Sequence, residues 1–159
     1  CPYRTCRSWF VNQMFLSKLP HRAPFVFVDS ILSISANKAK ASWTVNPGDG
    51  IFQGHFPGDS IVPGVLLIES MAQTAGLVLI ARDPDRAHSG TLVHSDVRFR
   101  LPVRPPANIL LTATEDGSFG SVHRFSVAAH LENVLVADGT LALSVQSPTV
   151  SARDSKRPA

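Results

Sequence analysis

The residues best suited to chemistry lie in one short segment, between Gly54 and Gln73. His55 stands in a loop rich in glycine and proline, where a constrained backbone can present an imidazole side chain. Glu69 follows fourteen residues later in an apolar run, and burial favours the protonated form of a carboxyl, so Glu69 can act as an acid. A base and an acid beside an apolar surface suit proton abstraction next to a carbonyl group.

Backbone and amide groups in the same segment can support this pair. Gly64 and Val65 are expected at the start of a helix, where unpaired N–H groups and the helix dipole can hold a developing negative charge. Gln73 comes four residues after Glu69, on the same helix face, and is expected to hydrogen-bond to its carboxyl. Taken alone, a loop histidine is usually without function and a buried glutamate is often a structural ion pair. Their combination in one segment favours a catalytic site.

The helix that positions Glu69 is predicted over residues 63–82. Pro63 suits its first residue, and Asp83-Pro84 ends it. The apolar run is long enough to span a bilayer, but lipid would penalise the polar residues near its middle. Because the helix is apolar on nearly all sides, we expect it to be buried all round in a globular core, without membrane association.

Strand patterns flank this helix on both sides. Residues 25–34 are rich in β-formers, residues 38–45 alternate between apolar and polar, and the region of Asn37 between them is predicted to form a hairpin turn. After the helix, four strands are predicted over residues 91–100, 109–114, 121–131 and 134–145, with turns at 117–120 and 132–133. This order predicts an α+β fold in which a mostly antiparallel sheet wraps around one long buried helix. Such a sheet leaves one face uncovered, so we expect a dimer.

Composition excludes several classes of protein. A chain of 159 residues has the length of a single domain. Its 17% charged and 44% hydrophobic residues exclude a disordered chain. The net charge of +3 is mild and not clustered, so no nucleic-acid partner is predicted, although an acidic partner is compatible. Cys1 and Cys6 leave the body of the chain without a disulfide, which favours the cytoplasm. No His/Cys cluster indicates a metal site.

The two ends of the chain are predicted to lie outside the folded domain. Residues 1–13 show no clean periodicity and are interpreted as an N-terminal extension, from cloning or from a mis-assigned start. Residues 147–159 are polar and are predicted to be a disordered tail. The working domain is therefore predicted over residues 14–146.

The segment from Gly54 to Gln73 resembles the signature of the (3R)-hydroxyacyl-acyl carrier protein dehydratases of fatty acid synthesis, the FabZ type, which have a hotdog fold. Residues 19–25, the pair Val28-Asp29, and residues 97–103 also resemble the family. The resemblance covers about residues 16–146.

The resemblance implies a role for each matching residue. His55 matches the catalytic histidine and Glu69 the catalytic carboxylate, while the N–H of Gly64, with that of Val65, matches the group that binds the thioester carbonyl. Gln73 matches the glutamine that follows the acid. In the family the glutamate comes from the partner subunit, so each homodimer has two shared sites, and trimers of dimers are usual.

The implied reaction is the reversible loss of water from a 3-hydroxyacyl thioester. His55 would remove a C2 proton, Glu69 would protonate the departing C3 hydroxyl, and Gly64 would stabilise the enolate-like oxygen. No metal or organic cofactor is implied, since the substrate's carrier, acyl carrier protein or CoA, brings the phosphopantetheine arm. The acyl chain would lie in an apolar tunnel. The supporting or substrate-lining residues are Phe56, Pro57, Gly58, Gln73 and Phe99.

Some residues depart from the family pattern or have open roles. No proline precedes Ile61, which is expected to loosen the loop, and residues 104–108 replace the usual Pro-Gly-Asp turn. Chain length and pathway, primary or specialised, therefore stay open. Three arginines have two alternative interpretations. They are either a docking patch for an acidic carrier or solvated charges that keep an exposed edge strand from pairing with another chain. These arginines are Arg98, Arg100 and Arg104.

Two other functions compete with the dehydratase. A hotdog thioesterase needs the helix carboxylate to activate water but has no need of a loop histidine, so His55 argues against it. A non-catalytic subunit of a heteromeric dehydratase would normally lack His55 or Glu69, and this chain has both. An added isomerase activity is disfavoured because the bifunctional enzymes carry Asp at the position of Glu69. We assign no role to His94, His123 or His130.

Overall fold

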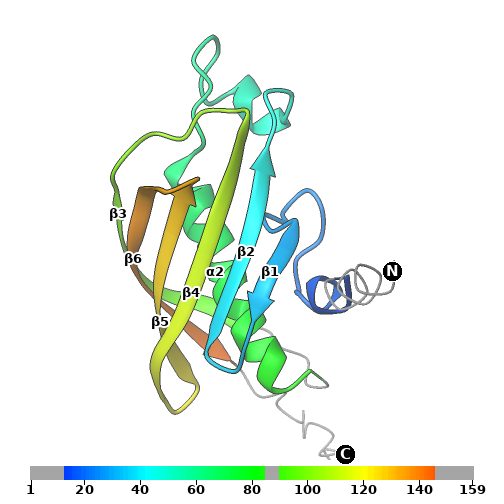
Figure 1. Cartoon of the computed structure of the whole chain (residues 1–159), viewed down its shortest axis with the longest axis vertical. Coiled ribbons are helices and arrows are strands. Elements are labelled where there is room, and N and C mark those ends of the chain that lie inside the picture. Colours follow the sequence, from blue (N-terminus) through cyan, green and yellow to red (C-terminus); the bar gives the residue numbers. More distant parts are fainter. Residues whose placement is uncertain (1–12, 85–89, 146–159) are drawn as a thin grey trace, which may run out of the picture.

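A six-stranded antiparallel sheet wraps around one long helix in the computed structural model, which describes residues 13–84 and 90–145 (Figure 1). This confirms the predicted α+β hotdog architecture. The predictions for residues 1–12 and 146–159 lie outside the described residues, and the domain bounds stay a prediction. The elements are β1 (Ser30–Ile34), β2 (Lys38–Val45), η1 (Gly50–Gln53), α2 (Gly64–Arg82), β3 (Gly90–Phe99), β4 (Ala107–Phe119), β5 (Val122–Leu131) and β6 (Val134–Val145).

The strand order is β1-β2-β4-β5-β6-β3, so the strand that follows the helix joins the far edge of the sheet. There β3 pairs with β6, with Val97 opposite Gly139. A Cβ at Gly139 would lie only 2.0 Å from the backbone oxygen of Asp96. Only glycine permits this close approach of β6 to β3.

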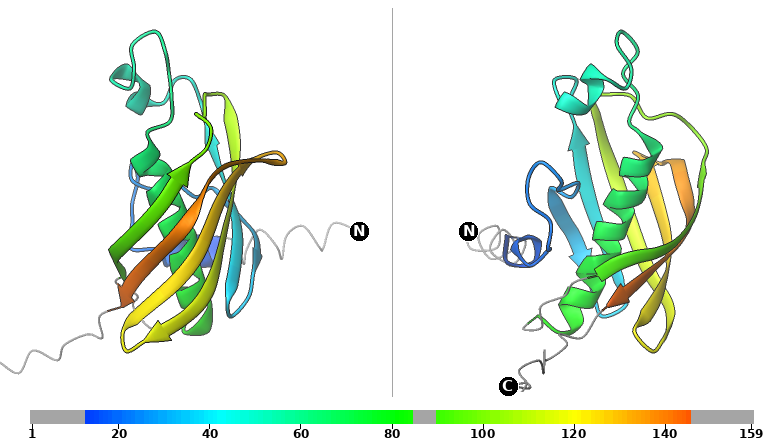
Figure 2. Two further views of the ribbon diagram at one scale, coloured as in Figure 1. Left: turned by 90° about the vertical axis from the view of Figure 1, so that its left-hand side faces the viewer. Right: turned by 180° about the vertical axis from the view of Figure 1, so that it is seen from behind.

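Small side chains on the inner face of the sheet let α2 pack closely against it. Figure 2 shows the helix lying across that face. Ala39, Ala41, Ala113 and Ala129 are fully buried. Larger buried side chains fill the rest of the core between helix and sheet, and alternation along β2 follows the predicted pattern. Close packing of these side chains therefore determines which face of α2 is turned toward the sheet. This large core includes Met71, Leu77, Val78, Leu111, Phe125 and Leu141.

The prediction that α2 is buried all round is wrong for its first turns. Val65 is 69% exposed, and Glu69 is only partly buried, whereas burial is nearly continuous from Ser70 onward. The reason is that the sheet covers the helix from one side (Figure 2). By length and composition α2 could cross a membrane, but its middle and C-terminal turns pack as the core of the described domain.

Several element boundaries differ from the predicted ones. Pro63 is the residue before the helix and not its first residue, and the first strand begins at Ser30. The predicted turn at 117–120 is misplaced, because β4 continues to Phe119 past a bulge between Glu115 and Gly117. The turn at 132–133 is confirmed, with Glu132 in the left-handed region at φ 51°.

Candidate active site

His55 is held in its loop by hydrogen bonds from both its ring and its backbone. The ring Nδ1 lies 2.9 Å from the carbonyl oxygen of Ile61, and the N–H of Ile61 donates to the carbonyl of His55 at 3.2 Å. Because a carbonyl can only accept, Nδ1 carries the proton of a neutral ring and Nε2 presents its lone pair. The Phe56 ring stacks on the imidazole, with centroids 4.0 Å apart. His55 is thus oriented as a base acting through Nε2.

The effect of the missing proline on the mobility of this loop stays a prediction, and the structure shows the contacts that close its turn. Phe56 and Asp59 exchange two backbone hydrogen bonds, of 3.2 and 3.0 Å, around the turn that contains Pro57 and Gly58. Gly58 has φ 81°, a conformation that favours glycine. Asp59 also forms an ion pair with Arg104. These contacts hold the loop without a proline before Ile61.

The start of α2 lies in the same open pocket as His55. Gly64, Val65 and Phe99 line this pocket together with His55. Leu66 and Leu67 donate to the carbonyl of Pro63, and helix geometry leaves the N–H groups of Gly64 and Val65 without intrahelical acceptors. Pro63 provides no side-chain cap. Two N–H donors at the positive end of the helix dipole therefore face the region of His55, as expected for an oxyanion-binding site.

Phe99 explains why the first helical residue is glycine. A Cβ on Gly64 would lie 2.8 Å from Cζ of Phe99 and 3.1 Å from two further ring atoms. The Phe99 ring, 48% exposed, thus rests directly on the helix start. His55, Gly64, Val65 and Phe99, which the sequence analysis names as candidate site residues, thus line one pocket, and their roles stay predictions.

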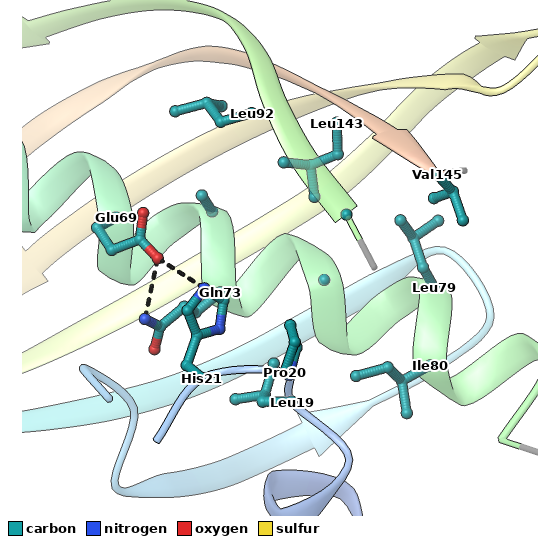
Figure 3. A pocket seen from close by; sticks show the side chains of 13 residues that line it. Leu19, Pro20, His21, Glu69, Gln73, Leu79, Ile80, Leu92, Leu143 and Val145 are labelled. Carbon is teal, nitrogen blue, oxygen red and sulfur yellow. Dashed lines mark hydrogen bonds and ion pairs between the residues drawn. The ribbon is translucent and has the colours of Figure 1, made fainter. Parts of the chain in front are cut away.

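Glu69 lies in a different pocket, where two side chains bond to the same oxygen of its carboxyl (Figure 3). Nε2 of Gln73 donates to Oε1 at 3.0 Å, which confirms the predicted Glu69–Gln73 hydrogen bond. Nε2 of His21 lies 3.2 Å from the same Oε1. Within the described part of the chain, Oε2 receives no such bond and remains open to a ligand.

Gln73 is itself fixed by the backbone of a distant segment. Its Oε1 accepts from the N–H of Phe27 at 2.9 Å, and its Nε2 also donates to the carbonyl of Phe25 at 3.1 Å. The side chain is 1% exposed, so its amide has one orientation. The second N–H is thereby committed to Glu69.

Sequence reasoning missed His21. It stands 48 residues before Glu69 in the chain, so no helical or strand spacing connects them. Its one sequence signal is its place within residues 19–25, a segment that carries the family resemblance. The fold brings it beside the acid.

Within one chain, the His55 pocket and the Glu69 pocket have no lining residue in common. In the single chain the base and the acid thus line two different pockets. Beyond Glu69, Gly76 and apolar side chains from the helix, β3 and β6 continue the second pocket (Figure 3). The apolar side chains are those of Leu79, Ile80, Leu92, Leu143 and Val145.

Two of the three arginines of the predicted docking patch are paired within the chain. Arg100 bonds to Asp138 at 2.5 and 3.0 Å, which lowers the pKa of that carboxyl, and Arg104 pairs with Asp59. Arg98 lies exposed on β3. The net positive charge of this surface is therefore smaller than the sequence suggests. Among the described residues, no three His, Cys, Asp or Glu side chains group as metal ligands.

A second buried polar cluster lies away from both pockets. The carboxylate of Glu115, 6% exposed, pairs with Arg82 at the end of α2 and with Nδ1 of His123 at 2.8 Å. Burial, and then the charge of Arg82, lower the pKa of His123. The cluster ties the end of the helix to β4 and β5.

Comparison with known proteins gives relatives over most of the chain. The model of the FabA-like domain family matches residues 19–146. The 3-hydroxyacyl-[acyl-carrier-protein] dehydratase FabZ of Paramagnetospirillum magneticum is 37% identical over 135 residues, covering 82% of this chain and 83% of that protein. The FabZ of Syntrophobacter fumaroxidans is 38% identical over 129 residues, covering 80% of this chain and 88% of that protein.

Solved structures share the fold at lower identity. The dehydratase heterocomplex ApeI:P from Xenorhabdus doucetiae superposes with a TM-score of 0.71 at 21% identity, covering 83% of this chain and 90% of that one. A hypothetical thioesterase with coenzyme A from Streptococcus pneumoniae gives 0.60 at 13% identity, covering 74% and 85%. These likenesses establish the fold and do not separate the two activities.

Proposed function

Because the chain belongs to the FabA-like family, we propose that it is a hydro-lyase acting on (3R)-3-hydroxyacyl thioesters of acyl carrier protein. It converts them reversibly to trans-2-enoyl thioesters in fatty acid or related lipid or polyketide biosynthesis. One observation carries the proposal: among the described residues nothing bonds to Nε2 of His55 or to Oε2 of Glu69, and each side chain is fixed by bonds to its other polar atom.

The first proposed step is proton removal at C2. Nε2 of His55 takes the proton, and the electrons of the C–H bond move toward the thioester carbonyl. The N–H groups of Gly64 and Val65 hold the developing oxyanion, as preorganised donors do most effectively in a site that excludes water. Phe56 and Phe99 support this half-site, by stacking on the imidazole and by covering the helix start.

The second step is loss of the C3 hydroxyl. Oε2 of Glu69 gives its proton to the departing oxygen as the C3–O bond breaks and the C2–C3 double bond forms. Water leaves, His55 has gained one proton, and Glu69 has lost one. Since these steps are proton transfers and the loss of water, we propose that neither a metal nor an organic cofactor is needed. The phosphopantetheine arm belongs to the substrate.

We propose that two copies of the chain complete the site. The separation of the His55 and Glu69 pockets within one chain supports this arrangement. Exposed apolar side chains near the edge strand also support it: Val93 and Phe99 on β3, Leu101 just after β3, and Val65 at the start of α2. In the described sheet β3 has a strand on one side only, and pairing of two such edges would bury this surface. A trimer of such dimers is a further proposal.

The apolar pocket beyond Glu69 is proposed to hold the acyl chain. Its walls come from Leu79 and Ile80 of the helix and from Leu92, Leu143 and Val145 of the facing strands. Apolar side chains of this kind stabilise a bound alkyl chain by removing its surface from water.

Arg98 is the proposed docking residue for the acidic carrier, since Arg100 and Arg104 already have carboxylate partners. Replacing Arg98 by glutamate is expected to raise the KM for acyl carrier protein substrates and leave that for CoA thioesters unchanged. Arg124→Glu, on β5, is the matched control. We also propose the cytoplasm as the compartment, because the predicted domain holds no cysteine.

The test of the activity is incubation with 3-hydroxybutyryl and 3-hydroxydecanoyl thioesters of acyl carrier protein, following the enoyl absorbance. We expect His55→Ala and Glu69→Gln each to lower kcat at least about a hundredfold. His130→Ala is the control and should keep wild-type turnover. Absence of turnover in both directions contradicts the proposal. Thiol release without enoyl product indicates a thioesterase, and activity that needs another subunit indicates a heteromeric enzyme.

A further inference from the structure

His21 approaches the acid from outside the helix that carries it. Its Nε2 lies 3.2 Å from Oε1 of Glu69, and Gln73 donates to that same oxygen at 3.0 Å. Two partners on one oxygen restrain the rotation of the carboxyl about its terminal bond. They also distinguish its two oxygens, so that Oε1 is an acceptor within the protein and Oε2 is left for a ligand.

The second ring nitrogen of His21 indicates which proton makes this contact. Nδ1 is buried and has no hydrogen-bond partner within the described residues. A proton on Nδ1 would be buried without an acceptor, which costs free energy. The ring is therefore expected to carry its proton on Nε2 and to donate it to Oε1. Nε2 of His21 then donates a hydrogen bond to Oε1 of Glu69 whether the imidazole is neutral or protonated.

Local contacts hold His21 in place before any substrate binds. Nη1 of Arg22 donates to the carbonyls of Leu19 and His21, both at 2.7 Å, which closes the turn that precedes the ring. Leu19 is buried against the core, and the Phe25 ring lies 6.2 Å from the imidazole. This segment is thus anchored on both sides of His21. The side chain itself is still 28% exposed at the pocket (Figure 3).

We propose that His21 is a positioning residue for the acid: with Gln73 it fixes the carboxyl of Glu69 so that Oε2 points to the substrate. The proposal rests on the proposed function of Glu69. It does not make His21 a catalytic residue, since its Nε2 is bonded to Oε1 of Glu69 and its proposed effect on the reaction acts through that carboxyl. A purely structural ion pair would instead affect stability and leave the chemical step unchanged.

The test compares His21→Ala with His21→Gln, whose side-chain amide can place an N–H near the position of Nε2. We expect His21→Ala to lower kcat by about tenfold to a hundredfold with little change in KM, because a misplaced acid slows the chemical step. His21→Gln should recover most of the rate. In a Glu69→Gln background, His21→Ala should cause no further loss. His130→Ala is the control, and thermal melts identify any variant that does not fold.

Wild-type kcat in His21→Ala overturns the proposal, as does a His21→Gln variant that folds but is as slow as His21→Ala. Nitrogen NMR of the His21 ring provides a readout independent of turnover. A proton on Nε2 whose signal changes in Glu69→Gln is expected, and a bare Nε2 with the proton on Nδ1 overturns the proposal. If the wild type has no activity, the proposed function fails while this NMR measurement still decides the contact.

Discussion

Replacing Gly76 by alanine is expected to stabilise the fold, and a larger side chain there should shorten the pocket beside Glu69. Gly76 lies inside α2, seven residues after Glu69, and lines the same pocket. A Cβ at this position would meet only Cδ2 of Leu19, at 3.9 Å, which is ordinary contact. Among the described residues the packing around this position therefore does not require glycine, and the open space is part of the pocket.

The expected magnitude follows from helix propensity. Glycine inside a helix is about 1 kcal/mol less favourable than alanine, because the unfolded chain loses more freedom on folding. Gly76→Ala should therefore raise the free energy of unfolding by about 1 kcal/mol. For a domain of this size that corresponds to a rise in Tm of about 3–5 °C. Urea and thermal denaturation measure it directly.

The same position tests the proposed acyl pocket. Gly76→Leu would fill the space between Glu69 and the apolar walls, so medium-chain 3-hydroxyacyl thioesters should lose turnover while the shortest substrate keeps it. The assay is kcat/KM over a series of chain lengths for wild type, Gly76→Ala and Gly76→Leu. A chain-length profile unchanged in Gly76→Leu refutes the pocket assignment. A Gly76→Ala protein less stable than wild type refutes the packing argument.

Two further changes probe other contacts. Gly64→Ala would place a Cβ 2.8 Å from the Phe99 ring; the half-exposed ring can move aside, so kcat should fall about tenfold or more with little loss of stability, and wild-type kcat contradicts this. The lowered pKa of His123, caused by burial and Arg82, means that below pH 6.5 the unfolded chain binds a proton that the folded chain does not. The free energy of unfolding should therefore fall as pH drops below 6.5, and His123→Gln should reduce this slope in urea titrations; an equal slope contradicts the assignment.

Local signals explain what could be predicted from the sequence. Pro63 and Asp83-Pro84 delimit the helix, and alternation along residues 38–45 identifies a half-buried strand. The Glu69–Gln73 bond follows from their four-residue spacing on a helix. Each of these features depends on neighbours within one or two turns of the chain.

The features that could not be predicted depend on distant partners. His21 reaches Glu69, Arg100 reaches Asp138 and Arg104 reaches Asp59 only after the sheet has formed. The exposure of the first turns of α2 likewise depends on how much of the helix the sheet covers. No spacing along the chain encodes these contacts, so only the tertiary structure reveals them.

Complementation between two inactive variants tests most directly the central claim that His55 of one subunit acts with Glu69 of another. Neither His55→Ala nor Glu69→Gln alone should form a working site. Mixed in equal amounts and allowed to exchange subunits, they should regain about a quarter of the wild-type activity, since half the dimers are mixed and each holds one intact site. A chain carrying both substitutions, mixed with wild type, is the control and should gain nothing from mixed dimers. Failure of the two single variants to regain activity, despite subunit exchange measured by mass spectrometry, contradicts the shared site.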